Sequence, residues 1–214
     1  MGYEKEYHEN VHNNLYANEI YYWARAKLSF KKYFSKIKNI QNLKVLEFGV
    51  GLGQNIILLK NRKAYDISKF ALEQCKKRGI EIIDDEKKIP NDFDIVFSCH
   101  CLEHLDLPLE NLKFLRNKLK ARGVLILIIP KLPHQKASFE PDKHYELHSW
   151  NFRTINNLLD RAGFKVVLNR YHYGTMYSKL LFLSAVSFKL YEFATWLAGR
   201  LLNRVEIKVV AVKK

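Results

Sequence analysis

Residues 43–53 of the chain read LKVLEFGVGLG. The apolar run at residues 43–48 ends abruptly at three closely spaced glycines, Gly49, Gly51 and Gly53. A short apolar run that stops at such a turn is typical of a buried parallel strand followed by a tight loop. In a doubly wound α/β sheet the ligand binds at the carboxyl end of this strand, where glycines let the backbone approach it closely.

Acidic residues near the loop indicate which kind of ligand it binds. A GxGxG pattern alone is weak, because such loops also bind dinucleotides or simply make a turn. Glu47 would repel a pyrophosphate, but it is useful beside a positively charged amino-acid group. Asp66 ends the second expected strand, where it can hold both hydroxyls of a ribose or act as a helix cap. Asp84 and Asp85 follow a third segment, either beside an adenine or as ordinary turn residues.

Strands and helices are expected to alternate along most of the chain. Ser68 is expected to cap a helix over residues 69–78, and Gly163 to end one over 152–162. The other expected helices cover residues 54–59 and 107–121, and the further strands cover residues 63–66, 80–83, 93–98, 123–130, 164–169 and 205–212. This order predicts an α/β fold with a doubly wound, mostly parallel seven-stranded sheet, which is Rossmann-like.

Two regions lie outside this alternation. Residues 1–40 are predicted as an N-terminal helical cap, because apolar and aromatic residues recur at near-helical spacing from Asn18 to Ile40. Residues 41–214 form the predicted core domain, with 170–203 as a helical insertion or lid. The segment 178–203 is about long enough to cross a bilayer, but Lys189, Glu192 and Arg200 favour an amphipathic lid or interfacial helix.

Composition sets few limits on the partners. The 214 residues carry a formal net charge of +14. This excess can favour nucleic acid, anionic lipid or an acidic substrate, or it can be general lysine usage, because the lysines are scattered. Cys75, Cys99 and Cys101 fit neither a disulfide framework nor a zinc knuckle. The polar N-terminus lacks the apolar core of a signal peptide, so we expect a cytoplasmic protein, with peripheral membrane contact through residues 178–203 as an open alternative.

Five segments together resemble a known family. They are VLEFGVGLGQN, YDISKFALEQCKKRGI, DFDIVFSCHCLEHL, GVLILIIP and HSWNFRTINNLLDRAGF, in this order within residues 43–169. They are similar to class I S-adenosylmethionine-dependent methyltransferases of the group that includes the ubiquinone-pathway O-methyltransferases. The helix after the first motif is a few residues shorter than in that family.

The resemblance implies roles for individual residues. The three glycines would wrap the methionine portion of S-adenosylmethionine, and Glu47 would support its ammonium end. Asp66 would hold the ribose, Asp85 or Asp84 would lie by the adenine, and the backbone from Cys99 to Leu102 would line the pocket near the sulfonium. The full predicted cofactor-binding set is Glu47, Gly49, Gly51, Gly53, Asn55, Asp66, Ile67, Asp84, Asp85, Cys99 and His100.

The predicted catalytic residues are His100, Glu103 and His104, where the fourth strand ends. A histidine there can act as general base for a hydroxyl nucleophile, although methyl transfer from a sulfonium relies largely on alignment. Two alternatives stay open. Glu103, His104 and His148, with His100 or Glu146, can make a divalent-metal site, although no metal is predicted. Glu103 and His104 can instead cap the following helix.

The predicted reaction is methyl transfer to oxygen on a small molecule, lipid precursor or glycan. The preference for oxygen comes from the resemblance and from CHCLEHL standing where related nitrogen methyltransferases carry an Asn-Pro-Pro-Tyr type motif. One alternative is an RNA methyltransferase, supported only by the charge. Another is a noncatalytic cofactor-binding or docking module. The candidate aromatic walls of the acceptor pocket, with the basic Arg25 and His172 among them, are Tyr21, Tyr22, Trp23, Arg25, Tyr145, Trp150, Tyr171, His172 and Tyr173.

Overall fold

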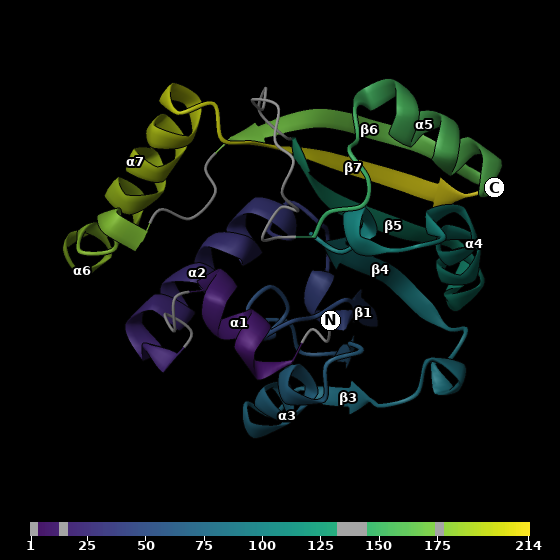
Figure 1. Ribbon diagram of the computed structural model, residues 1–214, viewed down its shortest axis with the longest axis horizontal. Helices are drawn as coiled ribbons and strands as arrows, with labels where there is room; N and C mark the ends of the chain where they lie inside the picture. Colours follow the sequence, from purple (N-terminus) through teal and green to yellow (C-terminus); the bar gives the residue numbers. More distant parts are fainter. Residues whose placement is uncertain (1–3, 13–16, 132–144, 174–177) are drawn as a thin grey trace.

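A seven-stranded sheet forms the centre of the protein (Figure 1). The structure is a computed structural model that describes residues 4–12, 17–131, 145–173 and 178–214. The strand order is β3-β2-β1-β4-β5-β7-β6. The strands are β1 Val45–Phe48, β2 Arg62–Tyr65, β3 Glu81–Ile83, β4 Phe93–Cys99, β5 Leu119–Lys131, β6 Phe164–Tyr173 and β7 Val205–Lys213. Strands β1 to β5 are parallel, and β7 runs antiparallel to β5 and β6. The predicted fold is confirmed.

Helices cover both faces of this sheet. They are α1 Lys5–His12, α2 Glu19–Tyr33, α3 Lys69–Lys77, α4 Pro108–Lys118, α5 Phe152–Arg161, α6 Leu183–Val186 and α7 Phe188–Leu201, and the 3-10 turns are η2 Ile40–Asn42, η3 Glu86–Lys88, η4 Leu102–His104 and η5 Ser178–Leu180. Ser68 caps α3 by accepting a hydrogen bond from the backbone of Ala71, as expected. Asn18 caps α2 in the same way.

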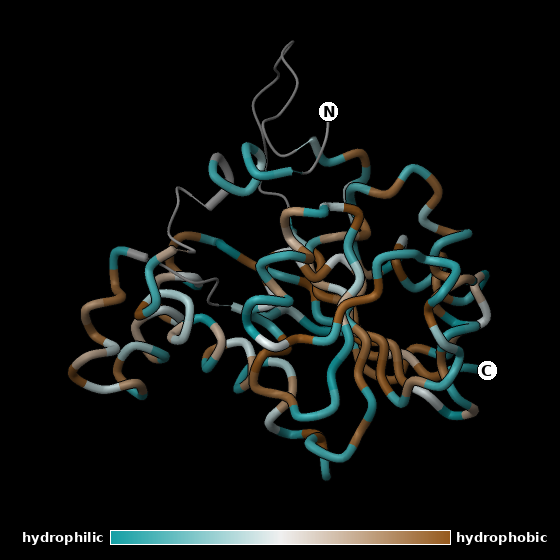
Figure 2. Tube along the Cα trace, turned by 90° about the horizontal axis from the view of Figure 1, so that it is seen from below, coloured by the Kyte–Doolittle hydropathy of each residue, from teal (hydrophilic) through white to brown (hydrophobic). Residues whose placement is uncertain are grey.

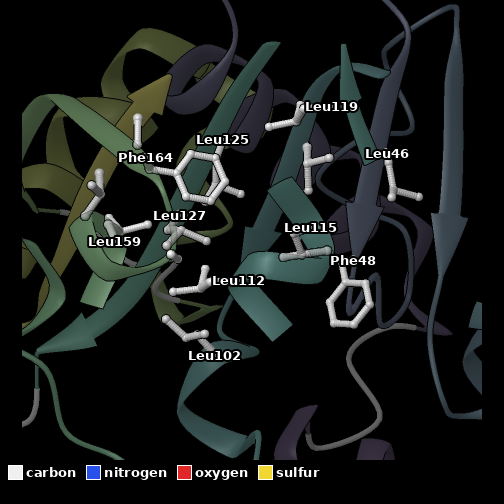
Figure 3. Packing of buried hydrophobic residues seen from close by; sticks show 14 of the residues in the cluster. Leu46, Phe48, Leu102, Leu112, Leu115, Leu119, Leu125, Leu127, Leu159 and Phe164 are labelled. Carbon is white, nitrogen blue, oxygen red and sulfur yellow. The ribbon is translucent and has the colours of Figure 1, made fainter. Parts of the chain in front are cut away.

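Two apolar clusters lie on opposite faces of the sheet, because successive strand residues point to opposite sides. Leu46 and Phe48 face α4 and α5, where Leu112 and Leu159 complete one core (Figure 3). Val45 faces α2 and α3 in the other core. The side chain of Glu47 therefore points towards the α2 side of the sheet, at the strand's carboxyl end.

Two predicted helices differ from the structure. Residues 51–58 form turns in place of the expected helix over 54–59. Gln54, Ile56 and Ile57 are all buried, so this segment has no exposed side for an amphipathic helix to present to water. The helix expected over 107–121 ends at Lys118, because Leu119 already pairs with Phe93 in the sheet.

Helices α6 and α7 lie to one side of the sheet, next to α2 (Figure 1). Tyr191 of α7 packs with Ala24 and Leu28 of α2. One side of α7 is exposed, and Figure 2 shows hydrophobic residues in this outlying part of the molecule. No helix in the described ranges is both long and apolar enough to span a bilayer. The division at residue 40 and the lid over 170–203 stay predictions.

Candidate active site

Gly49, Gly51 and Gly53 form the turn after β1, and their φ angles are 75°, 51° and 79°. A Cβ atom at Gly49 would lie 2.5 Å from Cys101 Sγ, and one at Gly53 would lie 2.5 Å from Ile80 Cδ1. At Gly51 nothing lies within 4 Å of that position. The protein's own packing therefore requires Gly49 and Gly53, whereas Gly51 faces open space that a ligand can approach.

Glu47 is fully buried beside this loop. Its Oε1 accepts a hydrogen bond of 2.7 Å from Asn55 Nδ2, and Asn55 Oδ1 accepts one of 2.9 Å from Ser29 of α2. Its Oε2 has no hydrogen-bond partner among the described residues. Burial raises the pKa of Glu47 well above its usual range, although the bond from Asn55 lowers it. A buried oxygen without a donor is costly, and an ammonium group is a donor that would satisfy it.

Asp66 follows β2 and organises the same loop. Its Oδ2 accepts a hydrogen bond from the backbone N–H of Gly51 (2.8 Å), and its Oδ1 accepts one from Ser68 (2.9 Å). Burial raises its pKa, while these two bonds lower it. A carboxylate offers about four acceptor positions, so Asp66 keeps acceptor capacity for a ribose hydroxyl. Asp66 thus has a turn-forming role, and its predicted ribose contact is compatible with it.

The residues predicted near the adenine are more exposed. Asp84 forms an ion pair with Lys88 (3.3 Å), and Asp85 accepts a hydrogen bond of 2.9 Å from the backbone of Lys87. Both therefore behave as turn or capping residues, and their contact with adenine stays a prediction. Ile67, beside Asp66, is 66% exposed, which leaves an apolar surface for the flat face of a ring.

His100 lies at the end of β4 between two carboxylates. Its Nε2 is 3.1 Å from Glu206 Oε1, and its Nδ1 is 3.5 Å from Glu103 Oε1. Burial by itself would lower the pKa of His100, but the hydrogen bonds and charges of the two glutamates outweigh it and raise the pKa to about 10. The ring is therefore an imidazolium at neutral pH. His100 also has a φ of 53°, in the left-handed region that non-glycine residues rarely adopt.

His104 lies outside this group of side chains. Its Nδ1 is 3.4 Å from the carbonyl oxygen of Tyr145, and His148 Nε2 is 3.0 Å from that of Leu105. The backbone oxygen of Glu103 accepts bonds from Leu147 and His148, so residues 145–148 are joined to η4. Within the described part of the chain, no three histidine, cysteine or acidic side chains are arranged to hold a metal ion.

The expected aromatic residues do not gather at one place. Tyr22 lies under the glycine loop, where its hydroxyl donates to the carbonyl of Leu52 (3.2 Å). Trp23 is exposed on the outer side of α2. Tyr171 packs against Phe152, with 4.4 Å between ring centroids.

Glu206 of β7 is the site residue that the sequence analysis did not single out. It is 4% exposed and accepts hydrogen bonds from Lys32 Nζ (3.0 Å) and Tyr33 Oη (3.1 Å) as well as contacting His100. Burial opposes its charge, but Lys32 and His100 outweigh this and hold its pKa well below the usual range. The sequence did offer one signal, which is an acidic residue within an apolar strand. A charge buried in such a strand needs a partner, so the pattern indicates that Glu206 is paired. The sequence could not indicate which residues pair with it.

Comparisons with known proteins agree with the fold and identify the family. A family model described as a methyltransferase domain matches residues 17–169. No curated protein matches the sequence. The structure of magnesium protoporphyrin IX methyltransferase from Synechocystis PCC 6803 with bound S-adenosylmethionine has a TM-score of 0.61 and 13% identity, and the match covers 96% of this chain and 90% of that one.

Two other solved structures share the fold at low identity. A protein described as a methyltransferase from Bacillus halodurans has a TM-score of 0.59 and 18% identity, over 88% of this chain and 98% of that one. Phosphoethanolamine N-methyltransferase 2 of Haemonchus contortus, in complex with S-adenosyl-L-methionine, has a TM-score of 0.56 and 16% identity, over 97% of this chain and 60% of that one.

The described residues fit S-adenosylmethionine at three points. Glu47 has a buried oxygen without a donor, Asp66 retains acceptor positions, and Gly51 faces open space. The family match covers more than half of the chain. The chain therefore belongs to the methyltransferase domain family, and it is an S-adenosylmethionine-dependent methyltransferase.

Proposed function

We propose that the enzyme methylates a hydroxyl oxygen on a small molecule, lipid precursor or glycan. The observation that carries this proposal is the cluster of His100, Glu103 and Glu206, which lies where β4 ends and antiparallel β7 begins. This cluster can take up the proton that a hydroxyl releases. Resemblance to the ubiquinone-pathway O-methyltransferases also favours oxygen. The N-methyltransferase among the similar structures makes nitrogen the comparison to test.

The cluster suggests how the proton moves. When bound, S-adenosylmethionine would supply an activated methyl group for the acceptor oxygen, and S-adenosylhomocysteine would be released. His100 is 37% exposed on its side chain and Glu103 only 1%, so the histidine is the member that an acceptor can reach. Because the imidazole is already protonated, we assign proton uptake to the pair. Nδ1 first gives its proton to Glu103, and the freed Nδ1 then takes the hydroxyl proton, which leaves an imidazolium beside a protonated Glu103.

The experiment measures S-adenosylhomocysteine formed by the purified protein with hydroxylated acceptors and their amine analogues. We expect turnover with hydroxyl acceptors, and at least tenfold lower kcat in His100→Gln and Glu103→Gln with cofactor affinity retained. Glu110→Gln is the matched control, because Glu110 is an exposed partner of Lys113. Turnover with amines alone would contradict the oxygen assignment. Cofactor binding without any turnover would favour the noncatalytic docking module.

An RNA methyltransferase is the second candidate, and a basic groove favours it. The groove has a volume of about 600 Å³ and is lined by six basic residues, Lys32, Lys36, Lys120, Arg122, Arg170 and Lys208, but by only one acidic residue, Asp94. Such an excess attracts phosphates. The groove extends from the beginning of β4 to Lys32 and Tyr33. The side chains of these two residues donate hydrogen bonds to Glu206, which contacts His100.

RNA is the weaker candidate, because a basic groove attracts any anionic acceptor and does not single out RNA. Titration with single-stranded RNA at two salt concentrations tests it. We expect weak binding and no S-adenosylhomocysteine formation. RNA-dependent turnover that is lost in Arg170→Gln would reverse the preference.

A further inference from the structure

Helix α7 presents an exposed apolar surface that no described part of the chain covers. Leu190, Phe193, Leu197 and Leu201 are 44%, 57%, 38% and 75% exposed. They follow one another at intervals of three or four residues, which places them on one side of the helix. We call these four residues the α7 stripe. Trp196 lies next to it, with its ring 5.9 Å from that of Phe193.

The opposite side of α7 is anchored to the protein. Tyr191, Thr195 and Gly199 are buried there. Glu192 forms an ion pair with Lys31 of α2. Because these contacts determine which side faces inward, the outward direction of the α7 stripe follows from the fold. Large apolar side chains exposed together at this density usually mark an interaction surface.

The charges around the α7 stripe indicate what covers it. Lys179, Lys189 and Arg200 are exposed and have no acidic partner among the described residues, and Arg200 lies over the ring of Trp196 at 5.7 Å. Glu192 is the single acidic residue between 178 and 204, and Lys31 neutralises it. A second copy of a chain with a net charge of +14 would bring like charges together. Apolar side chains flanked by cations and tryptophan instead complement an anionic lipid surface.

The length of the helix decides how it would meet the membrane. Fourteen residues make a helix about 21 Å long, whereas the hydrocarbon core of a bilayer is about 30 Å thick. Helix α7 is also polar on one side, so it suits the interface plane and not a spanning position.

We propose that α7 lies on the surface of an anionic membrane, with the α7 stripe in the boundary between headgroups and acyl chains. Helix α7 leads into β7, where Glu206 contacts His100 near the start of the strand. The end of α7 at Leu201 is therefore close in sequence to Glu206 of the candidate active site. Binding of α7 to a membrane does not depend on which acceptor atom the enzyme methylates.

The test is sedimentation of the purified protein with vesicles of phosphatidylcholine alone or mixed with phosphatidylglycerol, without cofactor. We expect binding to the mixed vesicles, weakened by salt, and at least a tenfold loss in the double variant Phe193→Glu/Leu197→Glu. Leu107→Glu is the matched control, because Leu107 is 64% exposed at the start of α4. This variant should bind like the wild type. Circular dichroism and S-adenosylmethionine titration verify that each variant is folded.

Two results would overturn the proposal. One is wild-type protein that stays in the supernatant with both kinds of vesicle. The other is a loss of binding in Leu107→Glu as large as that in the double variant, because the general charge would then explain the attraction. Analytical ultracentrifugation of the same proteins tests whether a second copy of the chain covers the α7 stripe instead. A wild type that is dimeric and does not bind vesicles, with a double variant that is monomeric, would assign the α7 stripe to a dimer interface.

Discussion

Replacing Glu206 with glutamine is expected to destabilise the protein by about 2–4 kcal/mol. Glu206 is 4% exposed, and its carboxylate is the partner of Lys32, Tyr33 and His100. Glutamine keeps the shape and one acceptor oxygen but removes the charge. Breaking a buried ion pair from one side costs about 3–5 kcal/mol, because the remaining charge is left without its partner. The retained hydrogen bonding and the second carboxylate at Glu103 reduce this figure.

The same variant should change how stability depends on pH. The pKa of His100 is raised from 6.5 to about 10, so its stabilising contribution is complete below pH 6.5 and is lost as pH rises towards 10. The full shift corresponds to about 5 kcal/mol, but the side chain is 37% exposed, and solvent screening reduces this to about 2 kcal/mol. The lowered pKa of Glu206 acts at acid pH, where stability is lost as pH falls. Lys208, with a pKa lowered to about 8, adds stability as it loses its proton.

Urea unfolding at pH 6.5 and pH 9.5 measures these effects. The Lys208 contribution is present in both proteins, so the difference between wild type and variant isolates the His100 cluster. We expect the wild type to lose about 1.5 kcal/mol between the two pH values from this cluster, and the variant less than half of that. Glu110→Gln, at an exposed ion pair, should match the wild type. A Glu206→Gln variant with wild-type stability and an unchanged pH slope would refute the reasoning.

Three further predictions concern the cofactor loop and the core. Gly51→Ala should cost only about 1–2 kcal/mol of stability for its positive φ yet weaken S-adenosylmethionine at least tenfold, whereas Gly49→Ala should mainly lower the melting temperature, because its Cβ meets Cys101. Asp66→Ala should weaken cofactor binding in calorimetric titration by about 10–100-fold, and no binding to the wild type at millimolar cofactor would contradict the assigned site. Leu112→Ala should lower the free energy of unfolding by about 2–5 kcal/mol in urea, and a loss below 1 kcal/mol would contradict its fully buried position.

Local signals explain why most elements could be predicted. The apolar run before Gly49 is a strand, and Ser68 caps a helix through a bond to a residue three positions away. Such features depend on neighbours in sequence. The expected helix over 54–59 was wrong because its residues are buried on every side, and an apolar run does not distinguish a helix from packed turns. Helix α1 lies in a polar segment without a local apolar pattern. Glu4, just before this helix, accepts hydrogen bonds from the backbone of Lys69 and Phe70 at the start of α3, a contact between residues that are distant in sequence.

The sequence by itself determined the fold class, the glycine loop and the position of the acidic residues around it, because these follow from hydrophobic period and from backbone sterics within a few residues. Only the tertiary structure decided the environment of His100. Its partner Glu206 is 106 positions away along the chain, and antiparallel pairing of β7 with β5 brings the two together. The α7 stripe was likewise an apolar segment in sequence, and packing of Tyr191 against α2 decided which side remained outside. Contacts between residues that are distant in sequence set the charge state and the exposure of these side chains. A local sequence pattern contains no information about such contacts.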